Sequence, residues 1–241
     1  LSTADALLAE DPSLRSAFAA KAWALQRLKR PADLAKAGQA MLARLPGDAE
    51  VLSALGASQL LAGDLDGAAA TWRQLIDSGQ ATPLAYNNAA WLELFRGGAT
   101  PAALDWARRA VDQERGRDNH ASLNTLAAVY AELDRPAEAR EIFLRSVGPA
   151  RPLQGADWYV VGRTAEGFGL PDAARAIYAR VQAEPVDGAP DPTDAHVLAR
   201  RRLAKLPPPS PSPAPTTAAP APAPAPAPVT APAPAPKATK P

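Results

Sequence analysis

The sequence predicts an all-α protein folded as an α-solenoid, in which about five helical hairpins stack in line. Three observations predict this fold. Compared with itself, the 241-residue chain shows an internal repeat of 34 residues. Each repeat reads as two amphipathic helices separated by a short turn. Alanine is abundant, with 58 residues, and many of them recur at fixed places within the repeat.

Five repeats cover residues 15–188, and the third is about three residues longer than the others. Their bounds are 15–48, 49–82, 83–119, 120–154 and 155–188. Because each repeat can bury its apolar face only against a neighbour, we expect the core to be spread along the stack.

Small residues recur where the two helices of a repeat must approach closely. They are Ala22, Gly56, Ala90, Ala127 and Gly162 in the first helices, and Ala68, Ala103, Ala139 and Ala174 in the second helices. A larger side chain would push the two helices beyond an interaxial spacing of roughly 8–10 Å. Bulky Trp72, Phe143 and Tyr178 follow one turn later, and we expect them to fill the gap between successive hairpins.

Glycine and proline mark the turns and the helix starts. Glycine supplies a positive φ after a helix, and proline is tolerated at the first helical position because the N–H it lacks would be unpaired there. The turn glycines are Gly63, Gly97, Gly98 and Gly169, and the helix-start prolines are Pro31, Pro101, Pro136 and Pro171.

These residues and this spacing resemble the tetratricopeptide repeat (TPR) family, and the resemblance covers residues 15–188. It implies a right-handed superhelix in which the first helix of each pair lines the concave face, where ligand peptides usually lie. Gly38, Ala107 and Asp134 depart from the family pattern and leave the local geometry open. A different α-solenoid or an irregular helical bundle is the alternative.

Residues 1–14 read as the second half of a preceding repeat. In register, Pro12 takes the place of Pro46, and Leu7 that of Met41. We therefore expect a partial repeat here, in a chain that is the C-terminal piece of a longer protein. The alternative is a short N-terminal capping segment in which Ser2 or Thr3 is the helix N-cap.

Residues 189–206 are expected to form a capping helix, running from Asp191 to Leu206 with Thr193 as its N-cap. Leu198, Leu203 and Leu206 would cover the exposed end of the stack. The basic run Arg200 to Arg202 suits a solvated cap face near a helix C-terminus, and binding of nucleic acid or anionic lipid is the alternative.

Residues 207–241 hold 15 of the 27 prolines and alternate alanine with proline. Proline bars helix formation, and alanine offers too little apolar area to offset the entropy of ordering. We expect a disordered, extended tether that reaches about 100 Å at roughly 3.1 Å per residue.

Charge and motifs exclude several kinds of protein. Residues 1–206 carry 24 basic and 25 acidic side chains, so nothing indicates a nucleic-acid partner. Cysteine is absent, only two histidines occur, and no phosphate loop or catalytic motif is present. We expect no catalysis, no cofactor and no membrane insertion. No signal peptide is visible, and both a cytoplasmic and a periplasmic location remain open.

The leading functional hypothesis is a scaffold that binds a protein or peptide segment in the concave groove. The candidate contact residues are Trp23, Asn87, Trp91, Asn124, Tyr159 and Arg163. Asn can clamp a peptide backbone, aromatic rings supply anchor area, and Arg can take a carboxylate bidentately. The alternative role for Trp23 and Trp91 is packing between repeats, and that for the Asn residues is tying helix ends together.

Two other hypotheses stay open at this point. The chain could be the C-terminal accessory region of a larger bacterial enzyme, such as a transglutaminase-like one, since its Ala, Arg and Pro usage is typical of bacteria. It could also self-associate through exposed repeat ends. Some members of the TPR family bind acidic peptides, such as chaperone C-termini, with a set of Lys, Arg and Asn residues on successive first helices. The Lys members of this set are missing here, so the sequence does not support recognition of chaperone C-termini.

Overall fold

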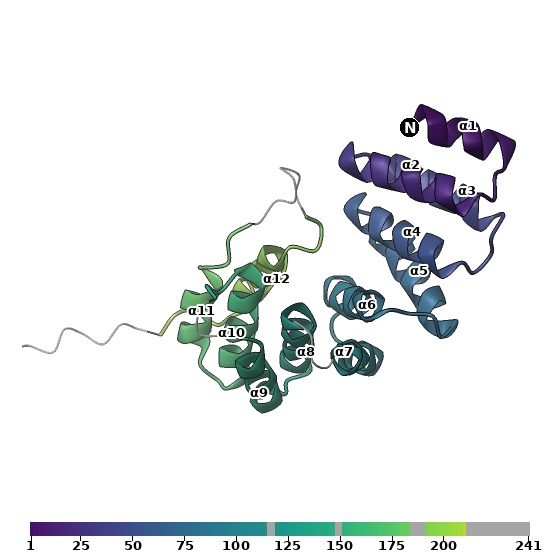
Figure 1. Ribbon diagram of the computed structural model, residues 1–241. Helices are drawn as coiled ribbons and strands as arrows, with labels where there is room; N and C mark the ends of the chain where they lie inside the picture. Colours follow the sequence, from purple (N-terminus) through teal and green to yellow (C-terminus); the bar gives the residue numbers. More distant parts are fainter. Residues whose placement is uncertain (115–118, 148–150, 184–190, 211–241) are drawn as a thin grey trace, which may run out of the picture. The chain divides into compact units, whose positions relative to one another are not determined.

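The structure is a computed structural model that describes residues 1–114, 119–147, 151–183 and 191–210. Over these residues all regular structure is helical, with twelve helices and no strand (Figure 1). The helices are α1 Ser2–Glu10, α2 Arg15–Arg27, α3 Pro31–Leu42, α4 Ala49–Leu61, α5 Leu65–Asp77, α6 Pro83–Arg96, α7 Pro101–Gln113, α8 His120–Glu132, α9 Pro136–Ser146, α10 Gly155–Gly167, α11 Pro171–Tyr178 and α12 Ala195–Leu203.

The chain divides into two units, Leu1–Pro209 and Ser210–Pro241. The predicted tether falls almost wholly in the second unit, and beyond Ser210 it lies outside the described residues. Within the first unit, successive helices pack against one another, and α2 to α11 form five pairs that match the five predicted repeats. First helices of neighbouring pairs also touch, α6 with α8 and α8 with α10. The all-α class is therefore confirmed, and the packing of successive helices is consistent with a helical repeat.

The close approach within each pair is confirmed by the residues at the crossings. A Cβ on Gly56 would lie 2.5 Å from Nε1 of Trp72, and one on Gly162 would lie 2.6 Å from the ring of Tyr178. Each ring thus lies against the glycine of its own pair, where we expected it to fill the space between pairs. Of the seven alanines predicted at the equivalent crossings, Ala22 of the first pair is only half-buried. The other six are fully buried: Ala68, Ala90, Ala103, Ala127, Ala139 and Ala174.

Turn chemistry follows the sequence pattern. The four predicted prolines, and Pro83 as well, each open a helix. Gly63, Gly98 and Gly169 have positive φ, whereas Gly97 is extended. Asp134, which stands where the family usually has glycine, takes φ 55° and makes the same left-handed turn. Side-chain caps mark the starts of α4, α5 and α12, at Asp48, Asp64 and Asp194. Thr82 and Thr100 cap α6 and α7, which also begin with proline.

Buried apolar side chains in the described part of the chain form three clusters, spread along the helices as expected. The largest joins residues of α6 to α12, the second joins residues of α4 to α7, and the smallest lies around Phe18, Met41 and Val51. The last helix therefore shares the core of the third, fourth and fifth pairs.

The two end segments differ from the predictions in detail. Helix α1 begins at Ser2 with Leu1 as its N-cap, so neither Ser2 nor Thr3 caps it. Helix α12 is nine residues long, shorter than expected. Its N-cap is Asp194, whose carboxylate accepts from the His196 N–H at 2.8 Å. Thr193 is not the cap, because its hydroxyl donates to Asp191 instead.

The contact between Gly56 and Trp72 predicts that Gly56→Ala destabilises the protein. The added methyl group meets the ring of a tryptophan that is only 1 % exposed and has no room to move. We expect the free energy of unfolding, measured by denaturant titration, to fall by about 1–3 kcal/mol. Gly97→Ala is the control, since its Cβ meets no atom within 4 Å and its φ is extended. Equal stability of the two variants would contradict the close crossing.

Candidate functional site

The structure distributes the six predicted site residues over three places. Trp23 lies on α2, Asn87, Trp91 and Asn124 line one cleft, and Tyr159 and Arg163 belong to a buried polar network. Trp23 is 65 % exposed with the Arg27 guanidinium 5.8 Å from its ring centre, so it does not pack between repeats.

The cleft has a volume of about 220 Å³ and lies between α6, α8 and the start of α10. Its lining residues are Asn87, Trp91, His120, Ala121, Asn124, Thr125, Arg151, Gln154, Ala156 and Asp157. Three residues from two different repeats that the sequence analysis selected are therefore brought together. The cleft is polar at one end and aromatic at the other.

A buried carboxylate, that of Asp157, organises the polar end. Its Oδ1 accepts from Nδ2 of Asn124 at 2.7 Å, and its Oδ2 accepts from the Gln154 backbone N–H at 2.9 Å and from Nη2 of Arg151 at 3.1 Å. Nε2 of His120 lies 3.3 Å from the same carboxylate. Asn124 thus ties α8 to α10, which is the structural role that the sequence analysis held as its alternative.

Asn87 differs from Asn124 in having an unused acceptor. Its Oδ1 is buried, and it has no hydrogen-bond partner in the described part of the chain. Leaving a buried acceptor unpaired costs about 1–3 kcal/mol. A donor that entered the cleft and reached this oxygen would remove that cost.

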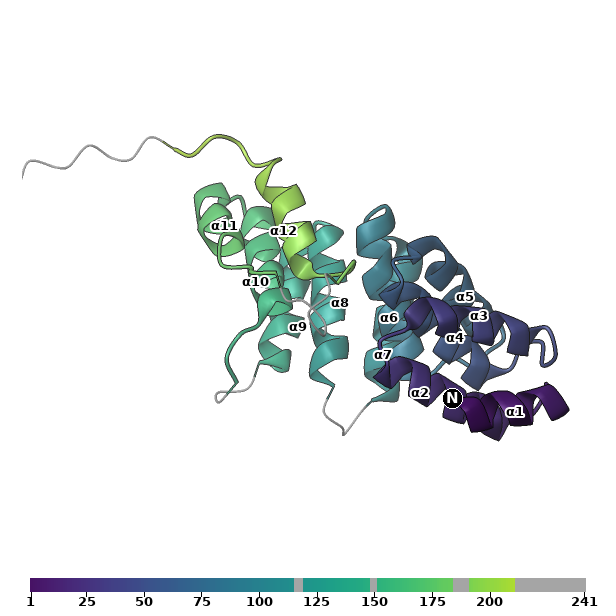
Figure 2. The same cartoon turned by 90° about the horizontal axis from the view of Figure 1, so that it is seen from above.

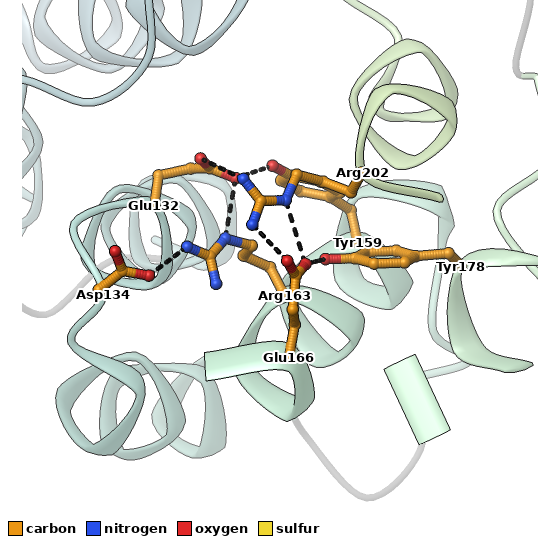
Figure 3. Close-up of polar contacts among 7 residues, drawn as sticks. All are labelled: Glu132, Asp134, Tyr159, Arg163, Glu166, Tyr178 and Arg202. Atoms are coloured by element: carbon orange, nitrogen blue, oxygen red, sulfur yellow. Dashed lines mark hydrogen bonds and ion pairs between the residues drawn. The ribbon is translucent and has the colours of Figure 1, made fainter. Parts of the chain in front are cut away.

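The second site is the buried network drawn in Figure 3. Arg163 is 3 % exposed, and its Nη2 donates to Asp134 Oδ1 at 2.5 Å. Its Nε lies 3.3 Å from Oε1 of Glu132, an ion pair without hydrogen-bond geometry. Its guanidinium is therefore engaged by the protein's own carboxylates, where we expected it to face a ligand.

Two tyrosines complete this network. The hydroxyl of Tyr159 donates to Glu132, and that of Tyr178 donates to Glu166 at 2.8 Å. Burial and the neighbouring carboxylates raise the pKa of both phenols. Tyr159 is 1 % exposed, so its ring supports the packing of α10 and does not offer an open anchor surface.

Arg202 of α12 reaches into the same network. It binds Glu166 through both Nη2 and Nε, the latter at 3.1 Å, and its Nη1 lies 4.0 Å from Glu132 (Figure 3). Burial alone would raise the pKa of Glu166, but the hydrogen bonds from Arg202 and Tyr178 outweigh it and hold that pKa below its ordinary value.

Helix α12 lies over one part of the surface that was expected to bind ligands, near Tyr159 and Arg163 on α10. It packs on α10 and α11, and both ribbon views draw it beside α10 (Figures 1 and 2). It also reaches back to α6, where Nε1 of Trp91 donates to the Thr193 carbonyl at 3.0 Å. Its role is therefore wider than capping the end of the stack.

The sequence analysis missed His120, Arg151 and Asp157 as cleft residues. The three-residue spacing of Gln154 and Asp157 at a helix start was the one available signal, because an acidic residue there can accept from the N-cap N–H. No group of three or more His, Cys, Asp or Glu side chains suited to a metal ion occurs among the described residues. Nor is any described helix long and apolar enough to cross a membrane.

A scan against models of protein families found no match to the sequence, and a search of curated proteins found none either.

The Glu166–Arg202 pair predicts a defined pH dependence. A carboxylate whose pKa is lowered by folding stabilises the protein above its ordinary value of 4.5, and this contribution is lost as the pH falls through the lowered pKa. At pH 7, Glu166→Gln should reduce the free energy of unfolding by about 1.5–3 kcal/mol, the range for hydrogen bonds to charged groups.

The difference between Glu166→Gln and the wild type should therefore shrink toward zero in acid, as denaturant titrations across this pH range can measure. The control is Glu141→Gln, which changes an exposed carboxyl on α9. A difference that stays constant down to the lowest pH would show that Glu166 does not act through its charge.

Proposed function

We propose that this protein is a non-catalytic binding module of the TPR type, and that it holds a short segment of a partner protein in the cleft between α6, α8 and α10. The observation that carries the proposal is the buried, unpaired Oδ1 of Asn87 beside the partly exposed ring of Trp91. A peptide offers the matching groups, a backbone N–H for the oxygen and an apolar side chain for the ring.

The arrangement of the polar end favours binding over catalysis. Nδ1 of His120 is 2.8 Å from the Ser146 carbonyl oxygen, and its Nε2 faces Asp157. Both ring nitrogens are thus engaged within the protein, which does not suit a general base that must reach a substrate. Arg151, about one third exposed, remains close enough to the rim to contact a peptide carbonyl or carboxylate.

The repeat pattern supports the assignment to the TPR type and to a right-handed solenoid. The 34-residue register, the small residues at the helix crossings and the prolines at helix starts are the features in which the chain resembles that family. In the family, ligands contact the first helices of successive pairs. Asn87 and Trp91 lie on one such helix, and Asn124 lies on the next.

The test is a selection from a displayed library of random short peptides on the full chain, followed by affinity measurements on single peptides. We expect Asn87→Ala to weaken binding at least about tenfold, which corresponds to roughly 1.4 kcal/mol. Helicity should not change, and stability should not fall, because the variant removes an acceptor that has no partner within the described part of the chain.

Gln74→Ala, which removes an exposed amide on α5, is the matched control and should bind as the wild type does. If the selected peptides bind Asn87→Ala as tightly as the wild type, the cleft is not their site and the proposal fails.

A further inference from the structure

One face of α12 is buried against the other helices, and Arg201 beside that face also binds α6. Ala195, Leu198, Ala199 and Arg202 are spaced i, i+3, i+4 and i+7, so they form a single stripe along the helix. The first three are at most 5 % exposed, and Arg202 binds Glu166. Arg200, off this stripe, is exposed.

The surface that receives α12 and the residues just before it, which we call the α12-binding face, includes Trp91 and Phe95 on α6, Glu132 on α8 and Glu166 on α10. Arg202 of the stripe meets the two glutamates, whereas Trp91 and Phe95 are bound by Thr193 and by Arg201. The Phe95 carbonyl lies in the last turn of α6, where backbone oxygens lack partners within the helix, and it accepts from Nη1 of Arg201 at 3.0 Å. The indole N–H of Trp91 is directed at the chain just before α12.

Charge makes the α12-binding face selective for arginine. Arg163 pairs with two carboxylates, those of Glu132 and Asp134, and Glu166 adds a third to the same network (Figure 3). The network therefore carries an excess of negative charge before Arg202 is added. The two bonds from Arg202 to Glu166 have the forked geometry that a guanidinium provides and an ammonium does not.

Helix α12 depends on this face for its own structure. It has nine residues, whereas an isolated helix shorter than about 12–15 residues is marginal in water. Its helical state is therefore coupled to its docking, and a segment that binds the same face more strongly can replace it.

We propose that the α12-binding face is a docking site for an arginine-bearing amphipathic helix of a partner protein, and that α12 is its internal competitor. The partner helix carries small, leucine, small and arginine residues in the spacing of the α12 stripe, and its binding displaces α12. This site is separate from the cleft, which no residue of α12 lines. Only Trp91 belongs to both.

The test uses the full chain and, as a probe, a labelled peptide with the sequence of residues 191–206. In the wild type the tethered α12 competes at the high effective concentration of an intramolecular ligand, so the peptide should bind weakly. Leu198→Asp removes the central apolar contact of the tethered helix, and the peptide should bind this variant at least about tenfold more tightly. Leu144→Asp changes an exposed leucine on α9 and should behave as the wild type does.

Arg202→Ala in the full chain is a second variant that weakens the docking of the tethered α12, in case Leu198→Asp disturbs the fold. We call these two the opened variants, because each should leave the α12-binding face free. The peptide itself is varied in parallel. Its Arg202→Ala form should lose at least about tenfold in affinity for the opened protein, whereas its Arg200→Ala form should not. If both forms bind equally, or if the wild type and both opened variants bind the peptide equally, the proposal is overturned.

Displacement is measured directly by hydrogen exchange on the wild type with excess peptide. The amides of Ala195–Leu203 should exchange faster, and those of α8 should not. Peptide binding that leaves the α12 amides protected would overturn the proposal. Asn87→Ala should leave the affinity of this peptide unchanged, because Asn87 is not part of the α12-binding face. The proposal for the cleft and the proposal for the α12-binding face can therefore be refuted independently.

Discussion

The fold depends on the close approach of the two helices in each pair. At Gly56 and Gly162 the absence of a side chain lets an aromatic ring lie directly against the helix backbone, and buried alanines permit a close approach in the third and fourth pairs. Because this contact recurs every 34 residues, it also sets where the first helices fall. The contacts of α6 with α8 and of α8 with α10 follow from it, and so do the cleft and the α12-binding face.

Two clusters of polar side chains, one around Asp157 and one around Glu132 and Glu166, connect helices of different pairs. Asp157 of α10 gathers partners from α8 and from the segment before α10, which fixes the polar part of the cleft. Glu132 and Glu166 gather Arg163, Arg202 and two tyrosines, which joins α12 to the last two pairs. Between these sites Trp91 contacts both the cleft and the chain before α12, so binding at one site has a physical route to the other.

Local and periodic features could be predicted from the sequence, and contacts across the repeats could not. The register placed the helix pairs, the crossing alanines and the helix-start prolines, since each is set within one repeat. It selected Asn87, Trp91 and Asn124 for a common site because they recur on first helices. It could not show that the Thr193 carbonyl returns to Trp91 across 102 residues, nor that Arg163 is buried among carboxylates, because neither contact repeats with the period.

The central claim is that the first helices form a binding surface on which α12 already sits, and the Trp91 indole N–H reports this most directly. Its hydrogen bond to the Thr193 carbonyl should make its exchange with solvent slow in the wild type, as measured by NMR with Trp91→Phe to assign the signal. In Leu198→Asp we expect this protection to be lost while the amides of α6 stay protected. An indole that exchanges at the same rate in both proteins would contradict the account.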